Sequence, residues 1–133
     1  MNRFNATVTK IQTQENLNIV NFEFASHKLS MMSLGLDESL KPSSLVELSV
    51  KPTHIALAKE FVGVVSYSNQ LDAKIIEVEN GELLSNIKLS VGDAKFESVI
   101  TKDSSTRMNL KTGDMVKIFI KASDLSIGEI IRC

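Results

Sequence analysis

The sequence predicts an all-β protein that consists of two small β-barrels in tandem, and three observations lead to this prediction. Short segments alternate apolar and polar residues, as half-buried strands do. Turn residues such as Asn80-Gly81 separate these segments. The order of strands and turns over residues 1–60 recurs over residues 61–133. A module of short strands avoids unpaired edges by closing on itself, which favours two OB-like barrels, each with a short helical turn.

The first half contains three segments with the alternation typical of strands, residues 6–11, 18–24 and 45–50. Residues 36–40 predict a short helical turn. Residues 41–44, Lys-Pro-Ser-Ser, predict a turn before the last strand. This half therefore has the strand and turn order of one small barrel.

The second half repeats this order. Its predicted strands are residues 74–78, 85–91, 96–100 and 115–120, and its helical turn is residues 104–110. The turn Lys111-Thr112-Gly113-Asp114 takes the place of residues 41–44.

The clearest part of the repeat follows the last strand of each half. Val50–Leu57 aligns with Ile120–Ile127 in the order β-forming residue, lysine, small residue, hydroxyl residue, polar residue, aliphatic residue, alanine or serine, aliphatic residue. We therefore predict two domains, residues 1–60 and residues 61–133, of which the first is the more degenerate copy.

Composition disfavours several classes of protein. Fifteen basic and sixteen acidic residues leave the chain nearly neutral, so no overall field attracts nucleic acid or a membrane. One tyrosine and no tryptophan disfavour a stacking surface for single-stranded nucleic acid. The single Cys133 excludes an internal disulfide and a cysteine-based metal site. The absence of an apolar signal segment and of a bilayer-spanning stretch predicts a cytoplasmic protein.

Four motifs of the second half resemble a known family. They are Ser66-Tyr67-Ser68-Asn69-Gln70-Leu71, Ile100-Thr101-Lys102-Asp103-Ser104, Leu110-Lys111-Thr112-Gly113-Asp114-Met115-Val116 and Ile120-Lys121-Ala122-Ser123-Asp124-Leu125. Together they resemble the molybdenum-pterin-binding (Mop, or TOBE-type) domain, strongly over the second half and in degenerate form over the first. The whole chain resembles a tandem, di-Mop molbindin.

This resemblance implies a molybdate or tungstate ligand, no organic cofactor, and a homo-oligomer with sites where barrels meet. The implied oxyanion ligands of the second half are Ser66, Ser68, Asn69, Thr101, Ser104, Lys121, Ala122 and Ser123. In the first half, Asn2 matches the opening asparagine, and the implied ligands are Ser30, Ser33 and Lys51, with Ser30 and Ser33 as the central pair.

The implied residues suit an anion that carries no proton. Molybdate and tungstate only accept hydrogen bonds, and hydroxyl groups, lysine and backbone N–H groups all donate. Phosphate keeps a proton near neutrality and is disfavoured by a site without an acceptor. Ser68 stands where the family has an arginine, which removes a bidentate cation. Arg107 is either a surface residue or the substitute for that arginine.

Each of these residues also has an ordinary structural interpretation. Lys51 and Lys121 suit solvated strand ends, and Thr101 or Ser104 suits the N-cap of the helical turn. His27 and His54 lack carboxylate or cysteine neighbours at ligand spacing, so no metal site is predicted.

No catalytic motif is present, so we predict a protein that is not an enzyme. The favoured function is storage, buffering or delivery of molybdate. The alternative is a sensory module that reports molybdate to a transporter or to the transcription machinery. A nucleic-acid-binding barrel and a ligand-free interaction scaffold are the remaining hypotheses.

Overall fold

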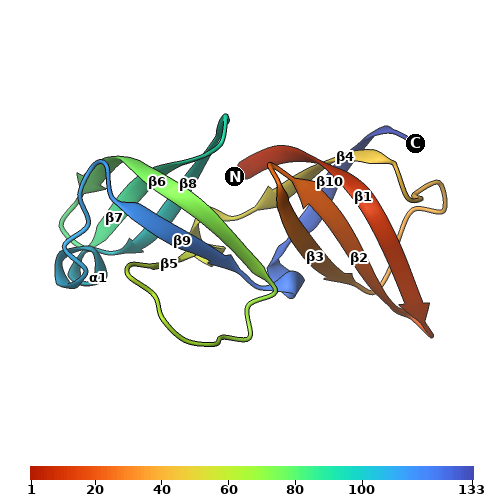
Figure 1. Ribbon diagram of the computed structural model, residues 1–133, viewed down its shortest axis with the longest axis horizontal. Helices are drawn as coiled ribbons and strands as arrows, with labels where there is room; N and C mark the ends of the chain where they lie inside the picture. Colours follow the sequence, from red (N-terminus) through yellow and green to blue (C-terminus); the bar gives the residue numbers. More distant parts are fainter.

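The computed structural model describes residues 1–133 as two curled antiparallel sheets of five strands each, which lie side by side (Figure 1). The first sheet has the order β10-β4-β1-β2-β3 and the second β5-β9-β6-β7-β8. The first contains β1 (Asn2–Gln14), β2 (Leu17–Phe24), β3 (His27–Ser33), β4 (Leu45–Val50) and β10 (Ser126–Arg132). The second contains β5 (Ala56–Ala58), β6 (Asn69–Asn80), β7 (Leu84–Val91), β8 (Ala94–Thr101) and β9 (Met115–Ile120). The all-β prediction with two OB-like barrels is confirmed.

The two sheets exchange strands at the segments that the sequence repeat marked most clearly. After β4 the chain makes a 3-10 turn, η1 (Pro52–His54), and β5 then pairs with β9 of the second sheet. After β9 it makes the matching turn, η2 (Ala122–Asp124), and β10 pairs with β4 of the first sheet. Each barrel therefore contains one strand from the other half, and the sheets do not follow the predicted boundary between residues 60 and 61.

The strand registers give the correspondence between the repeats. Asn2 pairs with Val50 in the first sheet as Asn69 pairs with Ile120 in the second. Residues of β1 to β3 thus correspond to residues numbered 67 higher (69 − 2), and those of β4 to residues numbered 70 higher (120 − 50). The first repeat is therefore three residues shorter between β3 and β4.

This shortening removes a helix. In the second repeat the connection contains α1 (Lys102–Arg107). In the first repeat the predicted helical turn over residues 36–40 is a single turn, in which the Leu40 N–H donates to the Asp37 carbonyl at 3.1 Å. With three residues fewer, the segment makes this one turn before the chain returns to β4.

The turn before the last strand confirms the alignment of residues 41–44 with residues 111–114. The Ser43 N–H donates to the Val8 carbonyl, and the Gly113 N–H donates to the Ile75 carbonyl, both at 2.8 Å. The backbone has a positive φ at both positions, 79° at Ser43 and 95° at Gly113. Glycine adopts this conformation without strain, whereas serine does not.

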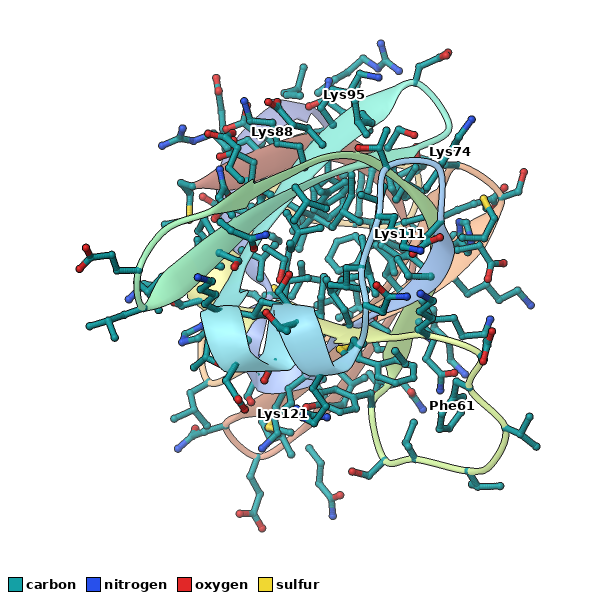
Figure 2. The ribbon with its side chains drawn as sticks, turned by 90° about the vertical axis from the view of Figure 1, so that its left-hand side faces the viewer. Phe61, Lys74, Lys88, Lys95, Lys111 and Lys121 are labelled. Carbon is teal, nitrogen blue, oxygen red and sulfur yellow. The ribbon has the colours of Figure 1, made fainter.

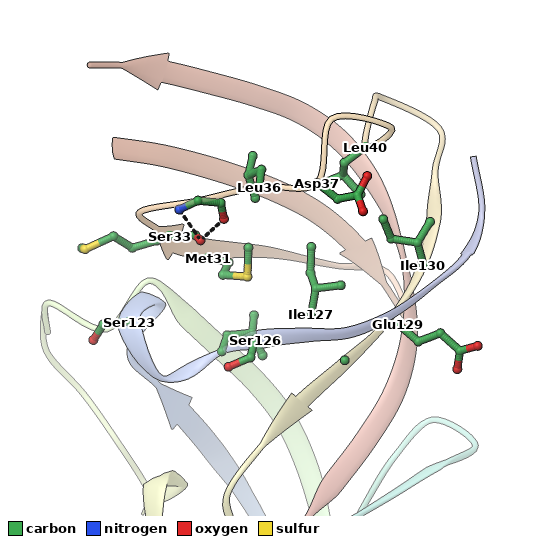
Figure 3. A pocket seen from close by; sticks show the side chains of 14 residues that line it. Met31, Ser33, Leu36, Asp37, Leu40, Ser123, Ser126, Ile127, Glu129 and Ile130 are labelled. Carbon is green, nitrogen blue, oxygen red and sulfur yellow. Dashed lines mark hydrogen bonds between the residues drawn. The ribbon is translucent and has the colours of Figure 1, made fainter. Parts of the chain in front are cut away.

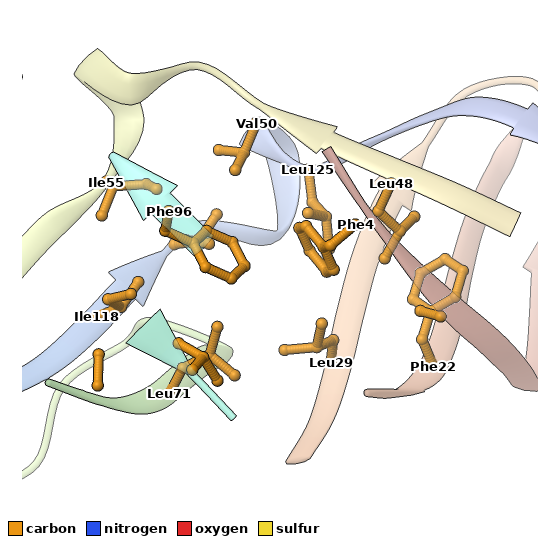
Figure 4. Packing of buried hydrophobic residues seen from close by; sticks show 14 of the residues in the cluster. Phe4, Phe22, Leu29, Leu48, Val50, Ile55, Leu71, Phe96, Ile118 and Leu125 are labelled. Carbon is orange, nitrogen blue, oxygen red and sulfur yellow. The ribbon is translucent and has the colours of Figure 1, made fainter. Parts of the chain in front are cut away.

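The apolar faces of both sheets form one core that continues across the boundary between the barrels (Figure 4). Alternate residues of β1 and β6 are buried, because successive side chains of a strand point to opposite faces. At the boundary, the ring centroid of Phe96 lies 5.0 Å from that of Phe4 and 6.1 Å from that of Phe24. The two barrels therefore share part of their hydrophobic stabilisation.

Candidate functional site

The opening and exit motifs of the second repeat meet at one end of β6. Because Asn69 pairs with Ile120, the residues just outside this pair are Ser68 and Lys121. The exit then turns through η2, which packs beside β3 of the first barrel. We call this place, where the start of β6, the end of β9, η2 and β3 meet, the Asn69 junction.

Most predicted ligands at the Asn69 junction reach solvent. Ser66, Ser68, Lys121 and Ser123 are exposed and Ala122 is half-buried. Lys121 lies on the outer surface of the molecule, away from the packed interior (Figure 2). Ser68 and Lys121 therefore flank one strand pair, and Ser66 and Ser123 are two residues further along the chain from each.

Asn69 differs from these residues because its side chain is completely buried. Its Nδ2 donates to the Ser30 carbonyl at 2.9 Å, and its Oδ1 accepts from the Ser30 N–H at 2.7 Å. The amide therefore pairs with the free edge of β3. The Ser30 hydroxyl donates to Asn21 Oδ1 at 3.1 Å, so this predicted ligand lies next to the junction but is itself hydrogen-bonded.

The first repeat builds the same backbone arrangement with different side chains, and we call it the Asn2 junction. Asn2 Nδ2 donates to the Glu97 carbonyl at 2.9 Å, and Asn2 Oδ1 accepts from the Glu97 N–H at 2.8 Å. By the register above, Met1 takes the place of Ser68, and Glu97 that of Ser30. A thioether and a carboxylate replace two hydroxyl groups.

The predicted pair Thr101 and Ser104 forms a second cluster with Arg107 around α1. Thr101 is the N-cap, as expected, and its Oγ1 accepts from the Ser104 N–H at 3.1 Å. The Thr101 hydroxyl donates to Ser104 Oγ at 2.9 Å, and Arg107 Nη2 donates to the same oxygen at 3.0 Å. The structure therefore places the guanidinium group beside the two hydroxyl groups.

The Thr101 cluster lies far from the Asn69 junction of the same chain. Thr101 pairs with Leu84, next to the hairpin end of β6, whereas Asn69 begins that strand. The twelve residues of β6 span a path of about 36 Å at about 3.3 Å per residue. Figure 1 shows α1 at the outer end of the second barrel and η2 near the middle of the molecule. One chain thus keeps the two predicted ligand groups apart.

The register corrects the predicted correspondence between the central pairs. Ser30 and Ser33 correspond to Glu97 and Ile100, so the counterpart of Thr101 is Leu34, which is exposed. The sequence comparison matched Ser30 and Ser33 to Thr101 and Ser104 with a one-residue difference in the spacing to Lys51. Strand pairing shows instead that the first repeat is three residues shorter between β3 and β4. Ser33 forms a local hydrogen bond with Gly35.

Two cavities adjoin these residues. A cavity of about 530 Å³ lies between β10 and the segment after β3, with Met31, Leu36, Ile127 and Ile130 among its lining residues (Figure 3). Ser33 and Ser123 also line it, but so do the carboxylates of Asp37 and Glu129, which disfavour an anion.

The second cavity, of about 140 Å³, lies between η1 and η2 and brings Lys51 and Ser123 together. His54 and Asp124 also line it, with His54 Nδ1 3.6 Å from Asp124 Oδ1. Lys51 of the first repeat therefore lies beside Ser123 and Asp124, in the exit turn of the second repeat. Its position in the sequence did not indicate this proximity.

The sequence predicts no carboxylate neighbour at ligand spacing for either histidine. In the structure, each histidine lies close to an aspartate of the other repeat. His27 Nε2 accepts from the Asp72 N–H at 3.3 Å, and His54 lies beside Asp124. These contacts join residues 45 or more positions apart, so local spacing gave no signal for them. No three His, Cys, Asp or Glu side chains are placed to hold a metal ion, and no helix is long and apolar enough to cross a membrane.

Lys59, in the segment between β5 and β6, holds the end of α1 in place. Its ammonium donates to the carbonyls of Met108 and Asn109 at 3.2 and 2.8 Å and lies 3.0 Å from Asp114 Oδ2. The hydrogen bond from Lys59, followed by that from the Lys111 N–H, holds the pKa of Asp114 below its ordinary value. The Asp114 carboxylate therefore stays ionised in moderately acidic solution.

Lys59→Met is expected to lower the free energy of unfolding at pH 7, and to do so less in acid. Because the pKa of Asp114 is depressed in the folded state, its ion pair contributes above about pH 4 and is lost as the pH falls further. Urea unfolding between pH 7 and pH 2 measures this difference, with Lys102→Met on the exposed face of α1 as the control. A difference that stays constant with pH would contradict the assignment.

The structure is a tandem of two OB-like barrels that exchange one strand each. Residues 66–127 match the model of the TOBE domain, which confirms the resemblance of the second half to a Mop, or TOBE-type, domain. The first repeat has the equivalent strand order, so the chain is a tandem of two copies of one fold.

Two solved structures are similar to this chain. The fold is similar to that of the cytoplasmic molybdate-binding protein ModG, crystallised with molybdate bound, with a TM-score of 0.87 and 24% identity over 96% of this chain and 94% of that one. A molybdate-binding protein from Sporomusa ovata matches with 28% identity and a TM-score of 0.44, over 45% of this chain and 90% of that one. A search of curated protein sequences finds no match.

Proposed function

We propose that this protein binds molybdate or tungstate and stores, buffers or delivers it in the cytoplasm. The observation that carries the proposal is the Asn69 junction, where Ser66, Ser68, Lys121 and Ser123 present donors to solvent. The likeness of the whole fold to that of ModG, a molybdate-binding protein, supports it. Because the proposed activity is binding alone, the protein is not an enzyme, and it needs no organic cofactor, nucleic acid or membrane.

The chemistry of the donors supports a fully deprotonated oxyanion. The Lys121 ammonium supplies a charge-assisted hydrogen bond, and the serine hydroxyl groups fix geometry at about 1 kcal/mol each. Asp124, the nearest carboxylate along the chain, lies beside His54, which compensates its charge when protonated. Lysine and backbone N–H groups only donate, so discrimination against protonated phosphate depends on them, because the serine hydroxyl groups can also accept a hydrogen bond.

The proposed site is completed by a second copy of the chain. Thr101, Ser104 and Arg107 present donors at the outer end of the second barrel, about 36 Å along β6 from the Asn69 junction. Contact between the outer end of one copy and the junction of another would unite the two groups. We therefore propose a homo-oligomer, with Arg107 supplying the cation that Ser68 lacks.

Isothermal titration calorimetry with molybdate, tungstate, sulfate and phosphate tests the proposal. We expect submicromolar binding of molybdate or tungstate by an oligomer. Lys121→Ala should lower the affinity by about tenfold or more, because a charge-assisted hydrogen bond contributes about 1.5–3 kcal/mol. Lys10→Ala is the matched control, since Lys10 is an exposed lysine on β1 away from the junction. No heat with either metal oxyanion would overturn the proposal.

A further inference from the structure

The two buried asparagines connect the repeats in a way that no ligand role requires. Asn69 is 0% exposed and Asn2 is 6% exposed. Each gives its Nδ2 and its Oδ1 to the backbone of a single residue, Ser30 for Asn69 and Glu97 for Asn2. In both cases that residue lies in a sheet built mainly from the other repeat.

The Asn69 amide fills a gap at the edge of a sheet. β3 has a neighbour on one side only, so its other edge presents unpaired N–H and C=O groups. The amide supplies a donor and an acceptor to Ser30, as the backbone of a neighbouring strand would. Because buried polar groups are costly when unpaired, this pair of hydrogen bonds strongly favours one placement of β6 against β3.

The placement of β6 against β3 determines where the predicted hydrogen-bond donors Ser68 and Lys121 lie. Ser68 directly precedes Asn69 in the chain, and Lys121 directly follows Ile120, the strand partner of Asn69. η2, which contains Ala122 and Ser123, packs beside β3. A shift of β6 relative to β3 would therefore move Ser68 and Lys121 relative to the rest of the junction.

We propose that Asn69 is the positioning residue of the oxyanion site and not one of its ligands, an inference that rests on the proposed function. Its amide atoms are occupied and screened from solvent, so an anion at the junction contacts the exposed side chains around it. Asn69 acts on affinity through the position of these neighbours.

The first repeat provides a matched control. Asn2 makes the same two hydrogen bonds, but Met1 and Glu97 stand where the Asn69 junction has Ser68 and Ser30. Asn2→Ala and Asn69→Ala therefore remove the same pair of hydrogen bonds. Asn69→Ala disturbs the junction that holds Ser68 and Lys121, whereas the Asn2 junction holds Lys51 alone among the predicted ligands.

The test is titration of full-length Asn69→Ala, Asn2→Ala and unmodified protein with molybdate and with sulfate, well below the melting temperature of each variant. We expect similar losses of melting temperature in both variants. We expect molybdate affinity to fall about ten- to a hundredfold in Asn69→Ala, as when a partner that orients a ligand is removed, and to stay within about twofold in Asn2→Ala. The preference for molybdate over sulfate should fall only in Asn69→Ala. If either alanine variant does not fold, Asn69→Ser and Asn2→Ser, which keep a small buried hydroxyl, replace the pair.

The outcomes separate the inference from the proposed function. Equal molybdate affinities in both variants, whether reduced or unchanged, would overturn the inference while the unmodified protein still bound molybdate. Absence of binding by the unmodified protein would overturn the proposed function and the inference with it.

Discussion

Replacement of Phe96 by alanine is expected to lower the free energy of unfolding by about 3–5 kcal/mol, the usual cost of removing a buried phenylalanine ring. Phe96 is 1% exposed and belongs to β8, yet its ring lies 5.0 Å from that of Phe4 in β1 of the other sheet. The cavity would therefore open where the two barrels share their core. Urea unfolding followed by circular dichroism measures the loss.

The number of unfolding transitions and a control variant test whether the core is shared. A single unfolding transition should persist in Phe96→Ala, because one cluster of buried residues connects both barrels. Phe61→Ala is the control, since Phe61 is only half-buried and should cost less. Loss of stability confined to the second barrel, seen as two separate transitions, would contradict a shared core.

The separate halves of the chain are expected not to fold as monomers. Residues 1–60 lack β10, and residues 61–133 lack β5, so each half leaves a sheet edge unpaired and exposes the core around Phe4 or Phe96. A domain is stable by only about 5–15 kcal/mol, and losing a strand together with half of a shared core removes most of that.

Circular dichroism and sedimentation of the two peptides, alone and mixed in equal amounts, measure this effect. The mixture should recover the strand spectrum of the intact chain as a one-to-one complex. The control is intact protein cleaved after folding near Val62 and Val64, which are fully exposed, and this nicked protein should stay associated. Two halves that each fold as stable monomers would show that strand exchange is dispensable.

Much of the fold could be predicted from local pattern. β4 and β9 have the predicted bounds, residues 45–50 and 115–120, because an aliphatic residue recurs at every second position of each and is buried. Other predicted strands were too short, for example residues 74–78 within β6. The missing ends of β6, residues 69–73 and 79–80, are mostly polar. They are strand because they pair with β9 and β7, which local hydropathy does not encode.

The candidate site was predicted in part. The motif around Lys121 led to the Asn69 junction, and the N-cap role of Thr101 is confirmed. The burial of Asn69 and the approach of Asp124 to His54 could not be predicted, since both depend on contacts between distant segments. That these residues bind an oxyanion stays a prediction.

The sequence by itself determined the repeat, the type of each main element and the residue types offered to a ligand, because periodicity and turn chemistry are local properties. Only the tertiary structure decided that β5 and β10 cross between barrels, that Asn2 and Asn69 seal the two junctions, and that Thr101 lies far from Lys121. The physical reason is that a strand can pair with any complementary edge. The edge with which β5 or β10 pairs depends on the direction of the chain after η1 or η2. It also depends on the hydrophobic core that the two barrels share.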